Sequence, residues 1–302
     1  MRQPESQANE ARSRTAFDAA PLTIGFIGAG RAASTLAWSL ERAGHTMVVA
    51  ARGSAAADLA EALDARLAGR TEVLETSDVT ILAVPDGAIA RLAGDLAEGA
   101  VAGRGRVVAH LSGSQGIVVL APLAKRGYAT AAIHPLQVLS GWRIAPGTVF
   151  SVEADAAAGA VARRLVADLG GVQVELPAAA RTTYHAAAVM AANLGMTMLA
   201  EAIDLLERQG IPRAEALQGL GSLVRGGLEA SMDRGLPAAI TGPVARGDVE
   251  TVSGHLESLG GDPELRRAYA ATSLLTLRQS LREGRPQGDA AAAIRRLLEG
   301  AL

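Results

Sequence analysis

Two histidines are the first residues of this sequence that could move a proton. His134 is followed by Pro135, whose ring holds the preceding residue in an extended conformation. His185 follows Tyr184 at the start of an apolar helical stretch, and Asn193 lies eight residues later, on nearly the same face of a regular helix. Imidazole titrates near neutral pH and suits general acid–base catalysis. The alternative is that each group is structural and hydrogen-bonded inside the fold.

Two further polar segments could bind a small molecule. Ser112 and Ser114 follow an apolar run, where their hydroxyls could line a pocket or cap the next helix. The segment from Thr241 to Asp248 contains a turn and then Arg246, which could bind a carboxylate. Asp248 is placed to cap the helix that follows. A capping loop with a surface arginine is the alternative for this segment.

A glycine-rich turn near the beginning has a spacing typical of nucleotide binding. An apolar run at residues 22–27 predicts a buried strand, and a helical run follows the turn. Between them stand Gly28, Ala29, Gly30, Arg31, Ala32 and Ala33. Strand, G-x-G-x-x-A turn and helix in this order favour a dinucleotide-binding fold, in which the second glycine lets a pyrophosphate approach the backbone and the helix N-terminus. The alternative is a glycine-rich turn without a ligand.

The residues after the next strands indicate which dinucleotide. The strand predicted at 45–51 is followed by Arg52 and Ser54. The acidic residue that accepts hydrogen bonds from the ribose of NAD is missing there. Because Arg52 can pair with a 2′-phosphate and Ser54 can add a hydrogen bond, we expect NADP. Val84 and Pro85 follow another strand and are expected beside the cofactor. Asp86 is expected to be the N-cap of the next helix.

Apolar runs and helical stretches alternate through the first half of the chain. Strands are predicted at 22–27, 46–51, 72–74, 79–84, 107–110, 129–133, 149–152 and 172–175, with helices between most of them. This alternation predicts an α/β fold, a doubly wound and mostly parallel Rossmann sheet. From residue 180 onward only helices are predicted. The expected domains are a disordered leader at 1–20, a dinucleotide-binding domain at 21–177 and an all-α domain at 178–302.

One predicted helix, at 181–209, is unusually apolar. Its middle, residues 186–200, is apolar on nearly every face, which is typical of a helix that is buried on all sides. Such burial requires a helical bundle or a partner subunit. We expect no apolar run in the chain to be long and clean enough to span a membrane.

Composition limits the remaining possibilities. The 302 residues carry a net charge of −2, so we expect no nucleic-acid or membrane partner, and a cytoplasmic location follows. The chain has no cysteine, which excludes disulfides, thiolate metal sites and cysteine nucleophiles, and no metal site is expected. Lys125 is the only lysine in the sequence. No lysine can therefore act as an acid or form a Schiff base in the second half.

Several short segments occur here in one order that resembles a known family. They are Gly28-x-Gly30-Arg31, Val84-Pro85-Asp86, His110-Leu-Ser112-Gly113-Ser114, His134-Pro135-Leu136-Gln137, Tyr184-His185-Ala186-Ala187, Asn193 and Thr241-Gly-Pro-Val-Ala-Arg246-Gly-Asp248. Over residues 22–280 the chain resembles Rossmann-like oxidoreductases with a helical C-terminal domain of unknown function. These are related to pyrroline-5-carboxylate reductases, ketopantoate reductases, prephenate dehydrogenases and 3-hydroxyisobutyrate-type dehydrogenases. The resemblance implies a cleft between two domains and a homodimer built on the helical domain.

The expected activity is hydride transfer between NADP(H) and a small substrate. The substrate would be a 2-oxo acid resembling ketopantoate, or an imine that carries a carboxylate. Ketopantoate reductases and the hydroxyacid dehydrogenases use a lysine of the helical domain as the acid, and this chain has none there. His185 with Tyr184 is therefore the first choice for the acid, and His134 is the second. A deazaflavin cofactor remains an alternative, because related folds bind it.

The remaining site residues are expected to hold the substrate. His134 or Arg246 would bind its carboxylate with the help of Thr241, and Asn193 and Ser112 would orient it. The alternative from another class is a non-catalytic NADP-binding sensor or scaffold, because a Rossmann domain can bind cofactor without chemistry. The two hypotheses differ in whether the polar side chains converge.

Overall fold

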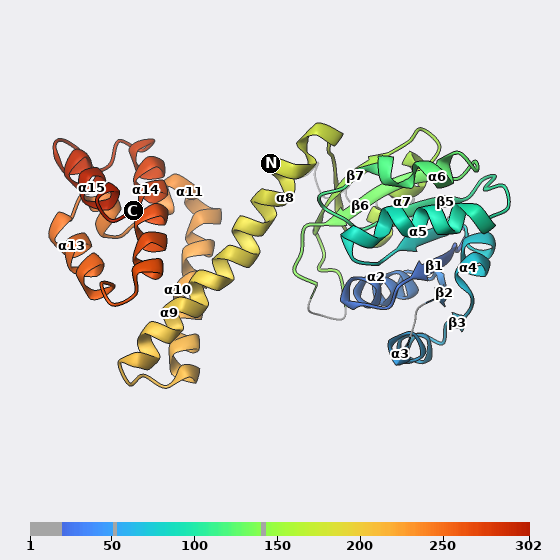
Figure 1. The fold of residues 1–302 in the computed structure, drawn as a ribbon, viewed down its shortest axis with the longest axis horizontal. Helices are drawn as coiled ribbons and strands as arrows, with labels where there is room; N and C mark the ends of the chain where they lie inside the picture. Colours follow the sequence, from blue (N-terminus) through green and yellow to red (C-terminus); the bar gives the residue numbers. More distant parts are fainter. Residues whose placement is uncertain (1–19, 51–52, 140–142) are drawn as a thin grey trace, which may run out of the picture. The chain divides into compact units, whose positions relative to one another are not determined.

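The computed structural model describes residues 20–50, 53–139 and 143–302. The chain forms two compact units, Met1–Ala192 and Asn193–Leu302, and each is described by itself (Figure 1). Nearly all of the predicted leader, and the predicted cofactor residue Arg52, lie outside the described residues. The predicted domain boundary, residue 177, immediately precedes the helical stretch that starts at Ala178, and the division between the units falls later within that stretch.

The first unit is built on one eight-stranded sheet, which confirms the predicted α/β class. The strands are β1 (Thr23–Ile27), β2 (Thr46–Ala50), β3 (Arg66–Leu67), β4 (Val79–Leu82), β5 (Val107–His110), β6 (Ala129–Pro135), β7 (Val149–Ala154) and β8 (Val172–Glu175). Their order is β3-β2-β1-β4-β5-β6-β7-β8. All neighbouring strands are parallel except β6 and β7, which pair antiparallel. The ends of β1, β4, β5 and β6 therefore meet at one edge, where such sheets bind their ligands.

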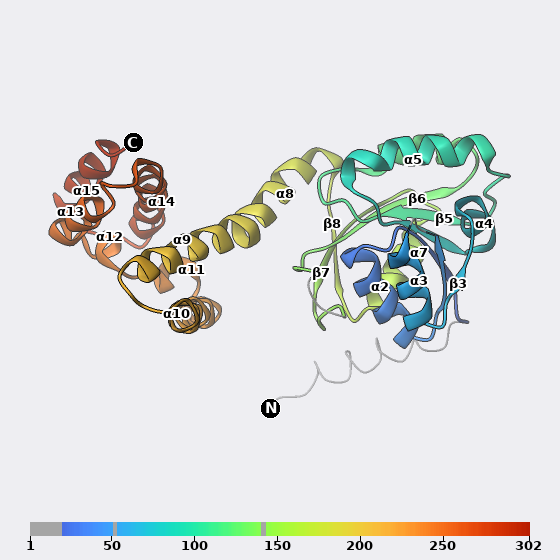
Figure 2. The ribbon, with the colours of Figure 1, turned by 60° about the horizontal axis from the view of Figure 1, so that its bottom comes forward.

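Helices cover both faces of this sheet. One face carries α2 (Arg31–Arg42), α3 (Ser54–Ala62) and α7 (Gly159–Asp168). The other carries α4 (Arg70–Thr76), α5 (Asp86–Gly99), the 3-10 turn Ile117–Leu120 and α6 (Ala121–Ala124), and α5 lies clearly apart from α2 and α3 in Figure 2. The parallel strands β1, β2, β4 and β5 are thus buried on both sides, which explains why they read as nearly continuous apolar runs in the sequence.

The strand pattern assigns alternate side chains to the two cores. Ile24 and Phe26 pack with Leu36 and Leu40 of α2, whereas Ile27 belongs to the core under α5. Successive residues of a strand point to opposite faces, so one short run supplies both layers.

One predicted strand is wrong. Residues 72–74 belong to α4, a seven-residue helix between β3 and β4. Val73 and Leu74 are both buried in the same core, which a helix allows and an alternating strand does not.

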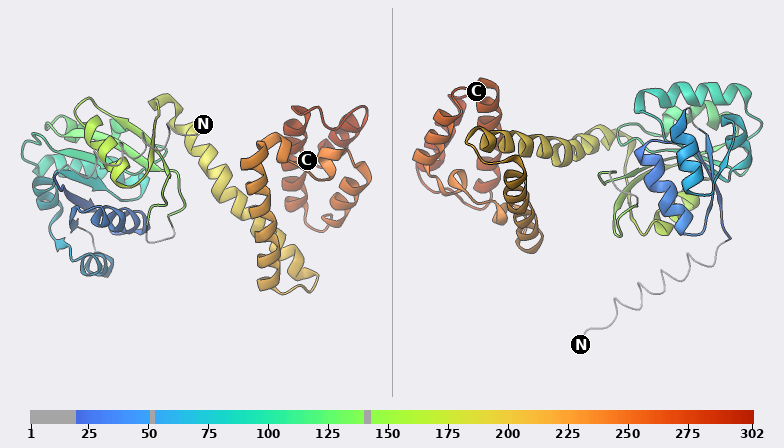
Figure 3. Two further views of the ribbon diagram at one scale, coloured as in Figure 1. Left: turned by 180° about the vertical axis from the view of Figure 1, so that it is seen from behind. Right: turned by 90° about the horizontal axis from the view of Figure 1, so that it is seen from below.

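The second unit is helical. A continuous helical stretch passes from α8 (Arg181–Val189) through a π-helical turn, Met190–Leu194, into α9 (Gly195–Arg208). It is followed by α10 (Arg213–Arg234), α11 (Leu236–Ala239), α12 (Pro243–Arg246), α13 (Val249–Ser258), α14 (Pro263–Leu281) and α15 (Ala290–Glu299). Helices α13, α14 and α15 gather in one bundle (Figure 3), whose core includes Val252, Leu256, Leu277, Ile294 and Leu298.

The apolar helix at 178–208 is exposed in the single chain. By length and composition it could cross a membrane, with a mean hydropathy of 1.5 over 18 residues, of which only 6% are buried. Met190, Leu194 and Met196 are each more than half exposed. The prediction that no apolar run is long and clean enough to span a membrane is therefore wrong by length and composition. The described residues do not bury this helix on all sides, and its cover by a partner subunit stays a prediction. Its apolar surface has no cover within the described parts of the chain.

Candidate functional site

The glycine-rich turn after β1 contains two glycines in different environments. Gly28 has a φ of +118°, and a Cβ there would lie 2.2 Å from the carbonyl oxygen of Ala83. Its N–H donates to the Ala50 carbonyl at 2.8 Å, which ties the turn to the end of β2. Gly30 instead has an extended backbone, with φ −76°, and a Cβ would meet nothing within 4 Å. It leaves open space before the N-terminus of α2, and no side chain caps this helix.

A carboxylate joins the ends of β4 and β5. Asp86 accepts hydrogen bonds from the hydroxyls of Ser112 at 2.6 Å and Ser114 at 2.9 Å. The prediction that Asp86 is the N-cap of α5 is wrong, because Pro85 occupies the cap position and Asp86 is the first helical residue. The carboxylate turns instead toward the loop after β5. It fixes residues 112–116, which we call the serine loop.

His110 is a structural histidine beneath this loop. Its Nδ1 accepts from the N–H of Ser112 at 3.2 Å, so its Nε2 donates to the carbonyl of Gly116 at 3.1 Å. The two contacts fix a neutral tautomer, and burial of the ring lowers the pKa of His110. Both ring nitrogens of His110 are therefore used inside the fold.

His134 and Tyr184 meet at the end of β6. The strand continues through His134 to Pro135, two residues beyond its predicted end, and pairs there with β7. Nδ1 of His134 lies 2.9 Å from the hydroxyl of Tyr184 on α8, with the two rings nearly perpendicular. This hydrogen bond orients the imidazole and leaves Nε2 for another partner.

Gly113 is the point where the two predicted catalytic histidines converge. A Cβ on Gly113 would lie 2.9 Å from Nε2 of His134 and 2.8 Å from Nδ1 of His185. The ring centroids of these histidines are 6.2 Å apart. Nδ1 of His185 is buried and has no hydrogen-bond partner in the described structure. Two ring nitrogens from different elements thus face the same glycine.

The surroundings keep His134 neutral. Burial lowers its pKa to about 4, and the nearby His185 and Arg181 act in the same direction, while Asp86 opposes them. At neutral pH His134 therefore carries one ring proton. When the Tyr184 hydroxyl donates to Nδ1, that proton is on Nε2 and points toward Gly113.

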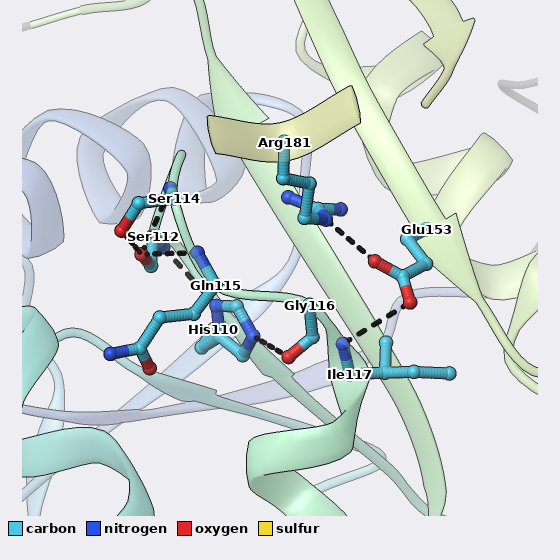
Figure 4. A network of polar contacts seen from close by, with 8 residues as sticks. All are labelled: His110, Ser112, Ser114, Gln115, Gly116, Ile117, Glu153 and Arg181. Atoms are coloured by element: carbon cyan, nitrogen blue, oxygen red, sulfur yellow. Dashed lines mark hydrogen bonds and ion pairs between the residues drawn. The ribbon is translucent and has the colours of Figure 1, made fainter. Parts of the chain in front are cut away.

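Sequence analysis missed the ion pair behind these histidines. Arg181, the first residue of α8, is 1% exposed, and its Nε donates to Oε2 of Glu153 on β7 at 2.5 Å (Figure 4). The available signal was a charged residue in each of two otherwise apolar segments. Burial requires such charges to be paired.

The other predicted site residues lie in several places. Ala29, Arg31 and Ala32 form the glycine-rich turn and the start of α2, Val84 follows β4, and Ser54 is exposed at the start of α3. These placements do not test their predicted roles.

The residues predicted to hold the substrate from the helical domain lie in the second unit. Asn193 is exposed within the π-helical turn, so the regular helical spacing from His185 that the prediction assumed does not apply. Thr241 and Arg246 are exposed on either side of the turn that opens α12. Asp248 caps α13 through the N–H of Thr251, as predicted.

The low pKa of His134 predicts a pH-dependent stability. Between pH 6.5 and about 4 the unfolded chain binds a proton at this position and the folded chain does not, so stability is complete above pH 6.5 and falls as the pH drops. We expect His134→Gln to flatten this dependence by a few kcal/mol, since one pH unit of pKa displacement corresponds to about 1.4 kcal/mol. Urea unfolding at pH 5 and 7.5 measures it. His110 supplies a residual slope, and equal slopes in both proteins would contradict the assignment.

Solved structures with the same fold include several reductases. A candidate NADP oxidoreductase from Bacteroides fragilis is 24% identical, with a TM-score of 0.69, over 85% of this chain and 98% of that one. A reductive aminase from Aspergillus terreus, solved with NADPH and ethyl levulinate, is 18% identical, with a TM-score of 0.64, over 92% and 99%. The 1-pyrroline-5-carboxylate reductase of Streptococcus pyogenes is 16% identical, with a TM-score of 0.57, over 93% and 98%. At these identities the likeness establishes the fold.

Two family models divide the chain between them. A Rossmann-like domain matches residues 1–135, and a domain of unknown function, DUF2520, matches residues 148–276. No curated protein matches the sequence. The second match includes β7 and β8 as well as the helices, so both Glu153 and Arg181 fall within it. The chain therefore combines a Rossmann-like domain with a DUF2520 domain.

Proposed function

We propose that this protein is an NADP(H)-dependent reductase that transfers hydride to a small imine carrying a carboxylate, or to a 2-oxo acid. The observation that carries the proposal is the convergence of His134 Nε2 and His185 Nδ1 on Gly113. Both imidazoles lie at the edge of the sheet that also holds the Gly28 turn. This convergence favours an enzyme over a sensor, which has no need for two ring nitrogens at one point.

The residues of the glycine-rich turn fit a dinucleotide. The open position at Gly30 admits a pyrophosphate, and the uncapped N-terminus of α2 offers N–H groups to it. Ser54, exposed beyond the end of β2, is available to a phosphate on the ribose, with Arg52 two residues before it. The absence of an acid at this strand end supports NADP. When bound, the cofactor supplies the hydride.

The imidazoles would manage the proton that accompanies hydride transfer. Hydride reaches the substrate carbon, and the electron pair of the C=N or C=O bond moves to nitrogen or oxygen, which then takes a proton. With no lysine in the helical domain, we assign the donor to His185, whose Nδ1 has no partner of its own. His134, oriented by Tyr184 and neutral, would hydrogen bond to the substrate.

The substrate class is best described as an imine with a carboxylate group. The reductive aminase and the pyrroline-5-carboxylate reductase of the same fold support the imine over the ketone. An iminium carbon accepts hydride readily and depends less on a strong acid, which suits a site without lysine. We retain Thr241 and Arg246 as candidates for the carboxylate and Asn193 for orienting the substrate. Ser112 would act through the Asp86 carboxylate that it holds.

We also propose a homodimer through the helical unit, which would cover the exposed apolar side chains of α10. Leu223 is 72% exposed, Leu228 57% and Met232 77%, more apolar surface than a lone helix presents to water. For the neighbouring apolar helix at 178–208, a second copy is also a better occupant than a lipid bilayer. Its first part, α8, is tied to the sheet through Arg181 and Tyr184. A cytoplasmic location fits this arrangement.

The dimer predicts a change in molecular mass on surface mutation. We expect sedimentation velocity to give twice the chain mass for the wild-type protein and a single chain mass for the Leu223→Glu/Leu228→Glu variant, because two charges cannot enter an apolar interface without a partner. The matched control is Leu302→Glu, an exposed leucine at the end of the chain. A wild-type monomer would contradict the proposal.

Cofactor binding can be separated from folding at Gly30. We expect Gly30→Ala to weaken NADPH binding by about tenfold or more, because its methyl group occupies the space for the pyrophosphate. Its melting temperature stays unchanged, since the backbone is extended and the space is open. Fluorescence titration with NADPH and NADH measures the affinity. Gly94→Ala, also in open space but within α5, is the control; equal affinities in both variants would remove the turn from the binding site.

Turnover tests the imidazole assignment. With saturating NADPH and 1-pyrroline-5-carboxylate or ketopantoate, we expect His185→Gln to lower kcat by at least about 100-fold, the usual scale of general acid–base catalysis. His255→Gln is the matched control, because His255 lies in the second unit and bonds Tyr269 with the same perpendicular ring geometry that His134 has with Tyr184. Loss of NADPH absorbance follows the reaction. Tight NADPH binding by the wild-type protein without turnover of any imine or 2-oxo acid would favour the sensor.

A further inference from the structure

The buried Glu153–Arg181 pair has no part in the proposed chemistry, yet Arg181 lies one turn of α8 before Tyr184 and His185. Both terminal nitrogens of Arg181, Nη1 and Nη2, are buried without a hydrogen-bond partner in the described structure. Burying a charge is unfavourable because the charge loses its hydration, and two guanidinium nitrogens of Arg181 gain no hydrogen bond in return within the described structure. The pair therefore calls for an explanation beyond stability.

The carboxylate of Glu153 also contacts the serine loop. Its Oε1 accepts from the N–H of Ile117 at 3.4 Å, at the point where the loop enters the 3-10 turn. A Cβ on Gly116 would lie 2.8 Å from Oε2, so the loop passes directly against the carboxylate. Figure 4 shows this arrangement, with Glu153 between Arg181 on one side and Ile117 on the other. One ion pair thus joins β7, the serine loop and α8.

Helix geometry carries this anchor to the catalytic residues. Tyr184 and His185 follow Arg181 by three and four residues, which places the three side chains on the same face of α8. Fixing Arg181 against β7 therefore fixes the rotation of the first helical turn. That rotation brings Tyr184 to Nδ1 of His134 and His185 to Gly113.

We propose that Arg181, held by Glu153, is the positioning residue of the imidazole pair, and that its fixed charge limits how many protons the pair can carry. The catalytic meaning of this rests on the proposed function, because it takes His134 and His185 as the reacting groups. The position of Arg181 beside Glu153 does not depend on the proposed function.

The charges around His134 agree with this role. The groups that face it are His185, Tyr184 and Arg181 from α8 and Asp86 from α5. Arg181 is a permanent cation, so it disfavours a proton on His134. Arg181 also acts on His110 in the same direction.

Histidine NMR of the cofactor-free, full-length protein tests the proposal without any need for turnover. We expect Arg181→Gln to raise the titration midpoint of His134 by about one pH unit, because a neighbouring positive charge is lost. Arg181→Lys keeps the cation without the planar guanidinium, so we expect the midpoint to stay low while the hydrogen bond of His134 to Tyr184 changes its chemical shift. If the protein proves active, the acid limb of its pH–rate profile moves with the midpoint in Arg181→Gln.

A second buried carboxylate gives a matched control. Asp168 lies 3.0 Å from Nε2 of His45 and 3.3 Å from Nε of Arg164, at the end of α7 near the starts of β1 and β2. We expect Asp168→Asn to destabilise the fold and leave the His134 midpoint unchanged. A purely structural role for Arg181 predicts the same behaviour from both variants.

Two results would overturn the proposal. One is an unchanged His134 midpoint in folded Arg181→Gln. If that variant does not fold, the neutral double variant Glu153→Gln/Arg181→Gln is read by the same criterion, and failure of both to fold shows that the pair is structural only. Failure of the proposed function is a separate result, since it appears as absence of wild-type turnover while the midpoints can still be measured.

Discussion

A buried positive charge constrains the first unit more than any other single feature. Once Arg181 is placed under the edge of the sheet, a carboxylate must stand beside it, because an unpaired buried charge is strongly destabilising. Glu153 meets that need from β7, the first strand to run against the others. This contact ties the start of α8 to β7, and the serine loop passes directly against it.

Several polar groups near the Glu153–Arg181 pair are fixed in one protonation state or in one hydrogen-bonding orientation. His110 is fixed as a neutral tautomer by two backbone groups, and Asp86 is held by two hydroxyls. His134 remains neutral because burial lowers the pKa of its ring, and the nearby Arg181 guanidinium acts in the same direction. Only His185 retains a buried ring nitrogen without a partner in this cluster. The ring nitrogen without a partner is therefore the one that the proposed function assigns to the substrate.

The sequence allowed the sheet and the glycine-rich turn to be predicted because both depend on local pattern. Parallel strands read as apolar runs, and Gly28 is required by a positive φ that the turn imposes. Prediction failed where a contact is remote in sequence. Asp86 resembles a helix cap, yet its partners Ser112 and Ser114 come from the next strand. Arg181 resembles a solvated arginine, and only the fold shows that Glu153 lies next to it. For the apolar helix at 178–208 the sequence left two kinds of cover open, because a sequence cannot distinguish cover by the same chain from cover by another molecule.

Gly113 has a consequence for how sequences of this kind can diverge. With two imidazole nitrogens within 3 Å of the position that a Cβ would take, any side chain at 113 must displace His134 or His185. The glycine and the two histidines therefore behave as one heritable unit, although they are separated by many residues. A related sequence without the two histidines no longer requires glycine at this position. A sequence that retains them cannot replace the glycine without displacing an imidazole. Among related sequences, a side chain at this position should mark a change of chemistry before any other residue does.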